Sequence, residues 1–253
     1  EDVEVDGAYP DDYSLKFAGL WNVNPDVKGF INITGTTVNY PIVQSYDNDY
    51  YLRRDFYKQH NDHGIPFMDY RVKVEKPSDN IVVYGHNMTD GQIFGDPVKY
   101  KELDYYKEHP VIEFSTVSED GLYKVLPVCL ANDYENQGHV FDYLSFIDAE
   151  NDQQFAEFIE QLQYRSLINT DIDVKPGDKL ITLSTCSYEF TDMRTVIVAR
   201  KLRRDEDPSV DVEKAEVNPH PLYPDVFYRK YGGTKPEGVD DKWTTKSGIT
   251  NVS

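Results

Sequence analysis

The feature that most constrains the fold is a series of short segments, rich in β-branched and aromatic residues, that recurs from Gly29 to Arg200. Segments of this composition, bounded by turn residues, are typical of β-strands. The segment GFINITGTTVNYPIVQ, which begins at Gly29, predicts two strands about a turn at Thr34-Gly35. Turn clusters such as KPGD separate further predicted strands at 65–68, 80–84, 111–116, 121–130, 179–184 and 195–200. The chain is therefore predicted to be mainly β.

Two of the predicted strands, NIVVYG (80–85) and RTVIVAR (194–200), are apolar on both faces. A strand in a sheet with one face in water alternates apolar and polar residues, because successive side chains point to opposite faces. These two strands lack that alternation, so we expect both of their faces to be buried. A closed barrel or a sandwich provides such an interior.

Two helices are predicted outside the strand pattern. Residues Tyr13 to Trp21 carry one apolar stripe, which fits a short helix that ends at Asn24-Pro25. Residues 151–167 predict a longer amphipathic helix with an asparagine cap, and we expect it to cap the barrel. We divide the chain into an N-terminal helical segment, a β-barrel catalytic domain and an extended C-terminal tail with no periodic element, at residues 1–24, 25–204 and 205–253.

Acidic residues dominate the charge of the chain. Its 45 aspartates and glutamates outnumber 26 lysines and arginines, for a net charge of −19. A field of this sign repels phosphate backbones, so we expect no nucleic-acid partner. No apolar run approaches the ~20 residues that span a bilayer. We therefore expect the chain to be soluble as given. It begins at Glu1 without a methionine, so we expect any signal or anchor segment to lie upstream.

The two cysteines, Cys129 and Cys186, are too few for a disulfide framework or a cysteine-rich zinc site. They could form one bridge, or be one buried and one reactive thiol. Cys129 lies mid-strand among apolar residues, where a small, inert and reduced side chain is expected. Cys186 lies where an apolar strand enters a polar loop, and this position fits a buried thiol and an accessible one equally well.

A nucleophilic cysteine needs a neighbour that accepts its proton or stabilises the thiolate, and this neighbour is usually a histidine. His86 follows the predicted strand at 80–84 after one glycine, so it lies at a strand end as Cys186 does. His60 and His63 form an H-x-x-H pair without a third ligand at suitable spacing. We therefore predict no metal site and no cofactor.

Arg194 is the candidate for binding an oxyanion or a substrate carbonyl. It follows Cys186 after seven residues and opens the last predicted strand. If the strands at 179–184 and 195–200 form a hairpin, Arg194 lies across the turn from Cys186. Both side chains would then face one substrate.

These residues resemble a known family. TLSTC (182–186), followed by an arginine at the start of the next strand, resembles the active-site signature of sortases, and YGHN (84–87) resembles their histidine segment. The segment that begins at Gly29, together with DNDYYL (47–52), is similar to class B sortases. The resemblance runs from about Tyr13 to Lys201. It implies an eight-stranded β-barrel with an N-terminal helix and one long helix before the strand that carries the catalytic cysteine.

The resemblance also implies a function. Sortases are extracytoplasmic, membrane-anchored cysteine transpeptidases of Gram-positive bacteria. They cleave the C-terminal sorting signal of a secreted protein at a Thr–Gly-type bond, and they transfer the acyl group to an amine of the peptidoglycan precursor or of a pilin. By position, Cys186 would be the nucleophile, His86 the general acid/base and Arg194 the substrate and oxyanion clamp. The substrate groove would be lined by Asn48, Leu52, Ser184 and Ser187.

Three functions stay open at this point. The chain could anchor proteins to peptidoglycan, or it could polymerise pilins through a lysine of the next subunit. These two activities share their catalytic residues and differ only in the acceptor amine. The third alternative is a non-enzymatic β-barrel surface domain, for which Cys186 would be replaceable without loss of function.

Overall fold

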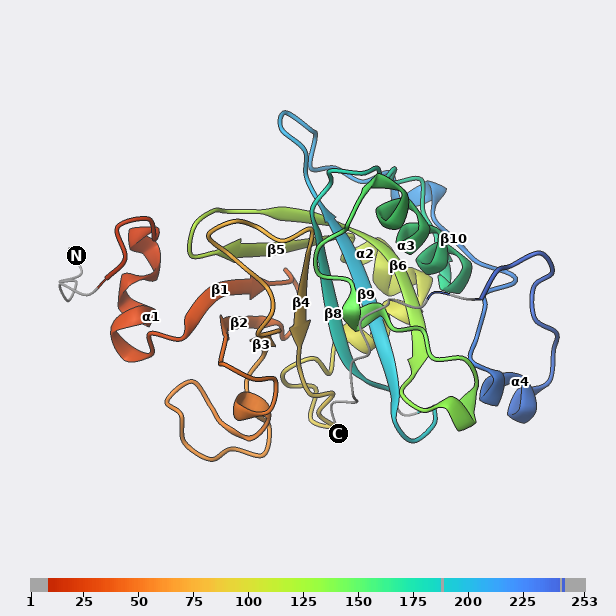
Figure 1. The fold of residues 1–253 in the computed structure, drawn as a ribbon, viewed down its shortest axis with the longest axis horizontal. Helices are drawn as coiled ribbons and strands as arrows, with labels where there is room; N and C mark the ends of the chain where they lie inside the picture. The colour runs from red at the N-terminus through yellow and green to blue at the C-terminus, as the bar shows by residue number, and fades with distance from the viewer. Residues whose placement is uncertain (1–8, 188, 242, 244–253) are drawn as a thin grey trace.

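The computed structural model describes residues 9–187, 189–241 and 243, and its centre is a closed eight-stranded barrel (Figure 1). Going around the ring, the order is β1-β2-β3-β4-β8-β9-β6-β5, and β5 pairs with β1 to close it. The predicted barrel is therefore confirmed. The strands are β1 Val27–Asn32, β2 Asn39–Val43, β3 Phe67–Met68, β4 Asn80–Tyr84, β5 Val111–Thr116, β6 Leu122–Asn132, β8 Leu180–Ser187 and β9 Met193–Lys201.

The predicted strand boundaries hold at β4 and β5 and fail at β8. The strand predicted from the sequence ends at residue 184, but β8 continues to Ser187. The reason is pairing: β9 runs antiparallel beside it over its full length, so the backbone of the polar residues after 184 is also hydrogen-bonded. Cys186 consequently lies within a strand and not in the loop that follows it.

The two-sided burial of the central strands is explained by two apolar clusters. Along β9, Ile197 and Ala199 belong to the cluster inside the barrel. Val196 and Val198 alternate with them and belong to a second cluster outside it. Helix α3 (Asp152–Arg165) covers this outer face with its apolar side, as predicted.

The predicted helices are present. Asn151 caps α3, since its side chain accepts a hydrogen bond from the backbone N–H of Gln154 at 3.0 Å. Helix α1 (Ala18–Val23) follows a 3-10 turn at Leu15–Phe17 and ends at Asn24. Helix α2 (Leu103–Glu108), with a 3-10 turn before it, was not predicted. None of the helices in the described part of the chain has the length and apolar character to cross a membrane.

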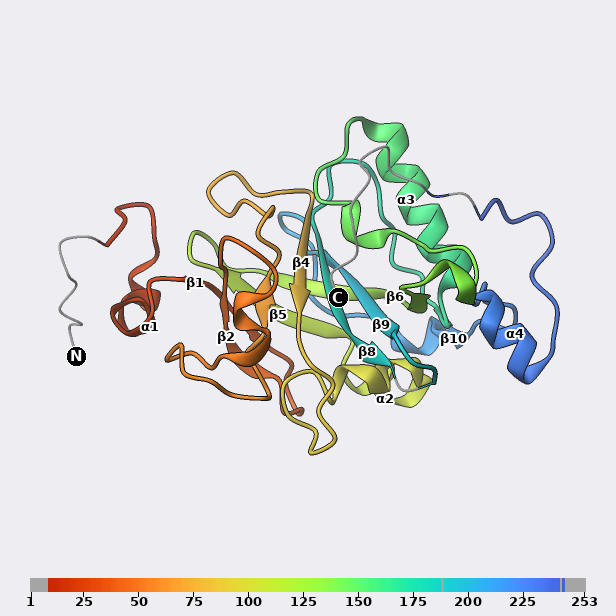
Figure 2. The same ribbon diagram turned by 60° about the horizontal axis from the view of Figure 1, so that its bottom comes forward.

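The prediction of a C-terminal tail without periodic elements is wrong for residues 205–241. β10 (Glu216–Val217) pairs with β7 (Ile168–Asn169), and Asp225–Tyr231 forms helix α4. With seven residues, α4 is too short to show a repeating apolar pattern. The tail runs along the side of the barrel that carries α3, and α4 lies at the opposite end of the molecule from α1 (Figures 1 and 2).

Candidate active site

The β8–β9 hairpin places Cys186 directly opposite Arg194, as the sequence predicted. The Nη1 atom of Arg194 lies 3.1 Å from Cys186 Sγ. Cys186 is partly exposed, whereas Cys129 is fully buried, and both thiols are free. Burial raises the pKa of Cys129 to about 12. The hairpin therefore places the positive charge of Arg194 beside the accessible sulfur of Cys186. Cys129 is the buried thiol that was expected to be inert.

A carboxylate holds the other side of the Arg194 guanidinium. Asp133 follows the end of β6, and its Oδ2 accepts a hydrogen bond from Arg194 Nε at 2.8 Å. Burial acts to lower the pKa of Arg194, but Tyr143, Asp133 and Cys186 around it raise the pKa above its ordinary value. The guanidinium is therefore charged at neutral pH, and its two edges are used by two different partners.

Parallel pairing of β4 with β8 brings His86 to the same end of the barrel. Tyr84 pairs with Ser184, so His86, just after the end of β4, and Cys186, near the end of β8, lie at the same end of the barrel. The side-chain amide of Asn87 donates to the backbone oxygen of Cys186 at 3.0 Å and links the two strand ends. This convergence is a consequence of strand register, which connects residues about a hundred positions apart.

The ring of His86 is bound to the opposite side of the site. His86 Nε2 lies 2.8 Å from the backbone oxygen of Leu52. A carbonyl oxygen only accepts, so Nε2 donates in this contact, and in a neutral ring Nδ1 is then unprotonated. Within the described residues, no hydrogen bond joins His86 to Cys186. Both side chains line one groove.

This groove has a volume of about 840 Å³ and is lined by Cys186, Arg194 and His86. Residues 46–49, 52 and 53 form one side of it, and residues 132–134 and 140–144 form the other. Of the four side chains predicted to contact substrate, the structure places Asn48, Leu52 and Ser184 in the lining.

Ser187 is the exception among the predicted residues. Ser187 is buried, and it is not among the described residues that line the groove. Its hydroxyl donates to Glu189, which also forms an ion pair with Lys101. While this bond holds, the Ser187 hydroxyl could only accept a hydrogen bond from a substrate.

A buried carboxylate, Asp69, connects the two sides of the groove. Asp69 Oδ2 accepts hydrogen bonds from Asn48 at 2.9 Å and from Tyr84 at 2.7 Å. Arg71 also binds Asp69, and its Nη2 donates to the backbone oxygen of Leu144 at 2.7 Å. Burial acts to raise the pKa of Asp69, but the hydrogen bonds from Arg71 and Tyr84 outweigh it and hold this pKa below its usual value. Asn48 is thereby fixed against the side formed by residues 132–144.

Sequence reasoning missed Asp133 and Tyr143. The Tyr143 hydroxyl lies 2.8 Å from Ser184 Oγ, so it fixes the residue two positions before Cys186. Both missed residues lie in the irregular segment between β6 and α3, where no periodic pattern marks a side chain as inward-facing. The one available signal was the position of Asp133 immediately after a strand end.

His60 and His63, the H-x-x-H pair, do not form a metal-binding cluster with other described side chains. His63 Nε2 lies 2.8 Å from a carboxylate oxygen of Asp90, and His60 lies 3.8 Å from Asp62. Among the residues that the structure describes, no group of three or more His, Cys, Asp or Glu side chains could hold a metal ion.

Comparison with known proteins points to one family. Residues 31–202 match the family profile described as "Sortase domain". The chain is 33% identical over 190 residues to a protein named Sortase B from Staphylococcus aureus, and the alignment covers 74% of this chain and 75% of the relative.

Solved structures give the same result. A Staphylococcus aureus sortase B–substrate complex is similar with a TM-score of 0.70 and 30% identity, over 77% of this chain and 88% of that one. A sortase B complexed with triglycine is similar with a TM-score of 0.68 and 31% identity, over 75% of this chain and 86% of that one.

Proposed function

The chain belongs to the sortase family of cysteine transpeptidases, in its class B branch, and from this membership we propose that it anchors secreted proteins to the cell wall. It would cleave a C-terminal sorting signal at a Thr–Gly-type bond and transfer the acyl group to an amine of the peptidoglycan precursor. The observation that carries this proposal is the contact between Cys186 Sγ and Arg194 Nη1, at 3.1 Å, in a groove that His86 also lines.

In the first half of the proposed reaction, the Cys186 thiolate attacks the scissile carbonyl carbon and forms an S–C bond. Arg194 is adjacent to the sulfur, so its guanidinium can donate to the oxyanion that develops there. The C–N bond then breaks, and the imidazolium of His86 gives its proton to the departing amine. The product is a thioester on Cys186.

In the second half, an acceptor amine attacks the thioester carbonyl and neutral His86 takes the proton from it. The C–S bond breaks, and the thiolate of Cys186 returns. This scheme requires His86 to reach the amine and not the sulfur. The separate anchoring of the two side chains is compatible with it, because the substrate nitrogen would lie between them.

The sorting signal would lie along Asn48, Leu52 and Ser184, which line the groove. The similar structures include one described as a substrate complex and one complexed with triglycine, whose amino group is the kind of nucleophile that the second half needs. We propose that the protein acts on the extracytoplasmic side of a Gram-positive membrane, as its sortase B relatives suggest.

The proposal is tested by incubating the protein with a panel of sorting-signal peptides and a panel of amines, with products identified by mass spectrometry. Cys186→Ala is the matched control. Cleavage that depends on Cys186, with transfer to a wall-type peptide amine, would establish anchoring. Transfer to a pilin lysine alone would establish the polymerase instead. Absence of cleavage and of any thioester would favour the non-enzymatic binding domain.

A further inference from the structure

The C-terminal tail is the part of the chain that the proposed chemistry leaves without a role. It lies outside residues 31–202, which match the family profile. Its described part, residues 205–241 and 243, nevertheless returns to the active site. It contacts residues 132–144, called the groove wall below, of which residues 132–134 and 140–144 line the substrate groove.

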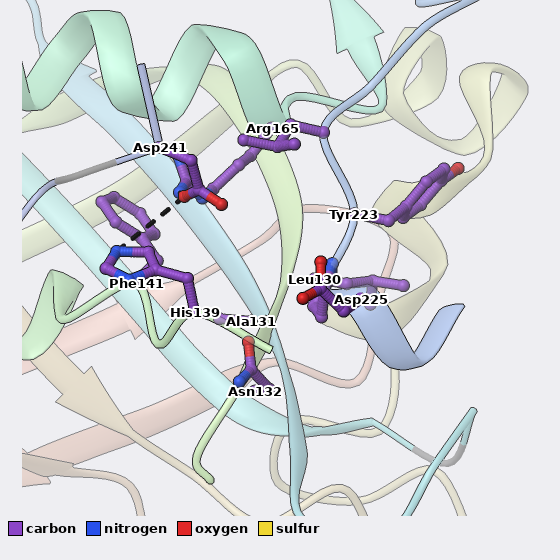
Figure 3. Close-up of a pocket in the computed structure, with 11 residues that line it drawn as sticks. Leu130, Ala131, Asn132, His139, Phe141, Arg165, Tyr223, Asp225 and Asp241 are labelled. Atoms are coloured by element: carbon purple, nitrogen blue, oxygen red, sulfur yellow. Dashed lines mark hydrogen bonds and ion pairs between the residues drawn. The ribbon is translucent and has the colours of Figure 1, made fainter. Parts of the chain in front are cut away.

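The first contact runs through Arg165, at the end of α3. Its side chain is 5% exposed and forms an ion pair with Asp241 of the tail. The guanidinium lies 4.3 Å from the ring centroid of Phe141, a groove-wall residue. Figure 3 shows Arg165 and Asp241 beside Phe141. His139 Nε2 lies 3.8 Å from the Asp241 carboxylate. Asp241 therefore holds a buried cation against the wall.

The second contact is made by Trp243. Its ring packs against Phe146 and Phe158 in the apolar cluster under α3, with centroid distances of 6.1 Å and 5.4 Å. Its Nε1 donates to the backbone oxygen of Asp142 at 3.2 Å. Asp142 precedes Tyr143, which binds Ser184 beside the catalytic strand end. Trp243 therefore fixes the wall backbone next to a side chain that lines the groove.

The third contact is made to the middle of this segment, between the two stretches that line the groove. Arg229, in α4, donates to the backbone oxygen of Asn136 at 2.8 Å. Gly138 lies so close to Asp225 that a Cβ at this glycine would be 2.7 Å from the Asp225 backbone nitrogen. The tail backbone and the wall backbone are therefore packed against each other, and not joined only by flexible side chains.

We propose that the tail is a clasp that holds the groove wall in its substrate-binding conformation, with Asp241 and Trp243 as positioning residues. This inference rests on the proposed function for its substrate. Beyond the last residue of β6, the described wall has only short 3-10 turns, so ordering it at the moment of binding would cost conformational entropy. A wall that is already held by the tail avoids that cost, and this raises affinity.

The clasp acts on substrate affinity more than on the chemical steps. Cys186, Arg194 and His86 come from strand ends of the barrel, whose positions are set by strand pairing. Asp133, which holds Arg194, directly follows β6, and its backbone N–H donates to the backbone oxygen of Asp192 in the β8–β9 turn at 3.2 Å, so its position does not depend on the tail. Loss of the clasp should therefore raise KM for the sorting signal and leave kcat nearly unchanged. A tail that only stabilised the fold would change neither constant in protein that remains folded.

The test compares Asp241→Asn and Trp243→Ala with wild type, using a peptide that wild type cleaves. Lys214→Gln is the matched control, because Lys214 joins the tail to Asp171 through an exposed ion pair and does not line the groove. We expect the two clasp variants to raise KM by about fivefold, with kcat within about twofold, since one immobilised side chain contributes about 1 kcal/mol. Wild-type values of KM in both variants would overturn the clasp.

A second measurement needs no substrate, which separates failure of the clasp from failure of the proposed function. Hydrogen exchange of the amides in residues 132–144 is compared between the same variants. Faster exchange in Asp241→Asn and Trp243→Ala, with Lys214→Gln like wild type, supports the clasp even if no peptide is cleaved. Unchanged exchange in the two clasp variants contradicts it.

Discussion

Arg194 Nη1 lies 3.1 Å from Cys186 Sγ, across a register pair of β8 and β9. The same guanidinium uses its Nε to bind Asp133 at 2.8 Å. Its position beside the sulfur is therefore determined twice, by strand pairing and by a carboxylate. A fixed donor beside the reacting atom needs no reorganisation when negative charge develops.

The guanidinium should not be replaceable by another cation. Lysine carries a single ammonium and cannot contact Asp133 and the sulfur through two edges of a planar group. We expect Arg194→Lys to lower kcat/KM by about 10²-fold or more, as loss of an oxyanion donor does. Steady-state kinetics on a cleaved peptide measures this, and near-normal cleavage by the variant would remove Arg194 from the mechanism.

Asp133 should act as a positioning residue for Arg194. In Asp133→Asn an acceptor for Nε is kept but the ion pair is lost, so we expect kcat to fall by about tenfold, with a smaller change in KM. The control is Asp173→Asn, which breaks an exposed pair with Arg203, neither of which lines the groove. Equal kcat values for the two variants would show that Arg194 is held by strand pairing alone.

Asp69 should make stability depend on pH in the acid range. Its pKa is lower in the folded protein than its usual value, so its contribution is complete above about pH 4 and is lost as the pH falls through the lowered pKa. We expect Asp69→Asn to reduce the free energy of unfolding by on the order of 3 kcal/mol at neutral pH, because Arg71 loses its carboxylate. Urea unfolding measures both proteins.

The direction in which the stability difference changes with pH tests whether the charge of Asp69 contributes. The difference between wild type and Asp69→Asn should shrink as the pH is lowered below about 4. A difference that stays constant over this range would mean that the charge of Asp69 does not contribute to stability.

Cys129 should be unreactive in the folded protein. It is fully buried and its pKa is raised to about 12, so almost no thiolate is present near neutral pH. We expect iodoacetamide to label Cys186 in native protein and to label Cys129 only after unfolding, as read by peptide mapping. A Cys129–Cys186 bridge in active protein would contradict both assignments.

The sequence predicted the local part of the site well. The two strands around residues 186 and 194 are consecutive along the chain, so a hairpin and the Cys186–Arg194 pairing follow from their order. The two-sided apolar pattern predicted a closed barrel or a sandwich, and the alternation of Val196 and Ile197 between two clusters explains that pattern in β9.

The non-local part could not be obtained in the same way. His86 meets Cys186 because β4 and β8 are parallel neighbours, and no short-range pattern encodes the register of strands that distant in sequence. Asp133 and Tyr143 act from an irregular segment whose path depends on tertiary contacts. The family resemblance supplied the role of His86, and only the structure revealed the partners that fix Arg194 and Ser184.

Acyl transfer is proposed to proceed through a thioester on Cys186. The most direct test is to mix the protein with a sorting-signal peptide, quench the reaction in acid and measure the intact mass, with the modified residue located by peptide mapping. We expect an adduct with the mass of the acyl fragment on Cys186, absent in Cys186→Ala and removed by an added amine. Cleavage that persists in Cys186→Ala, or an adduct on Cys129, would contradict the account.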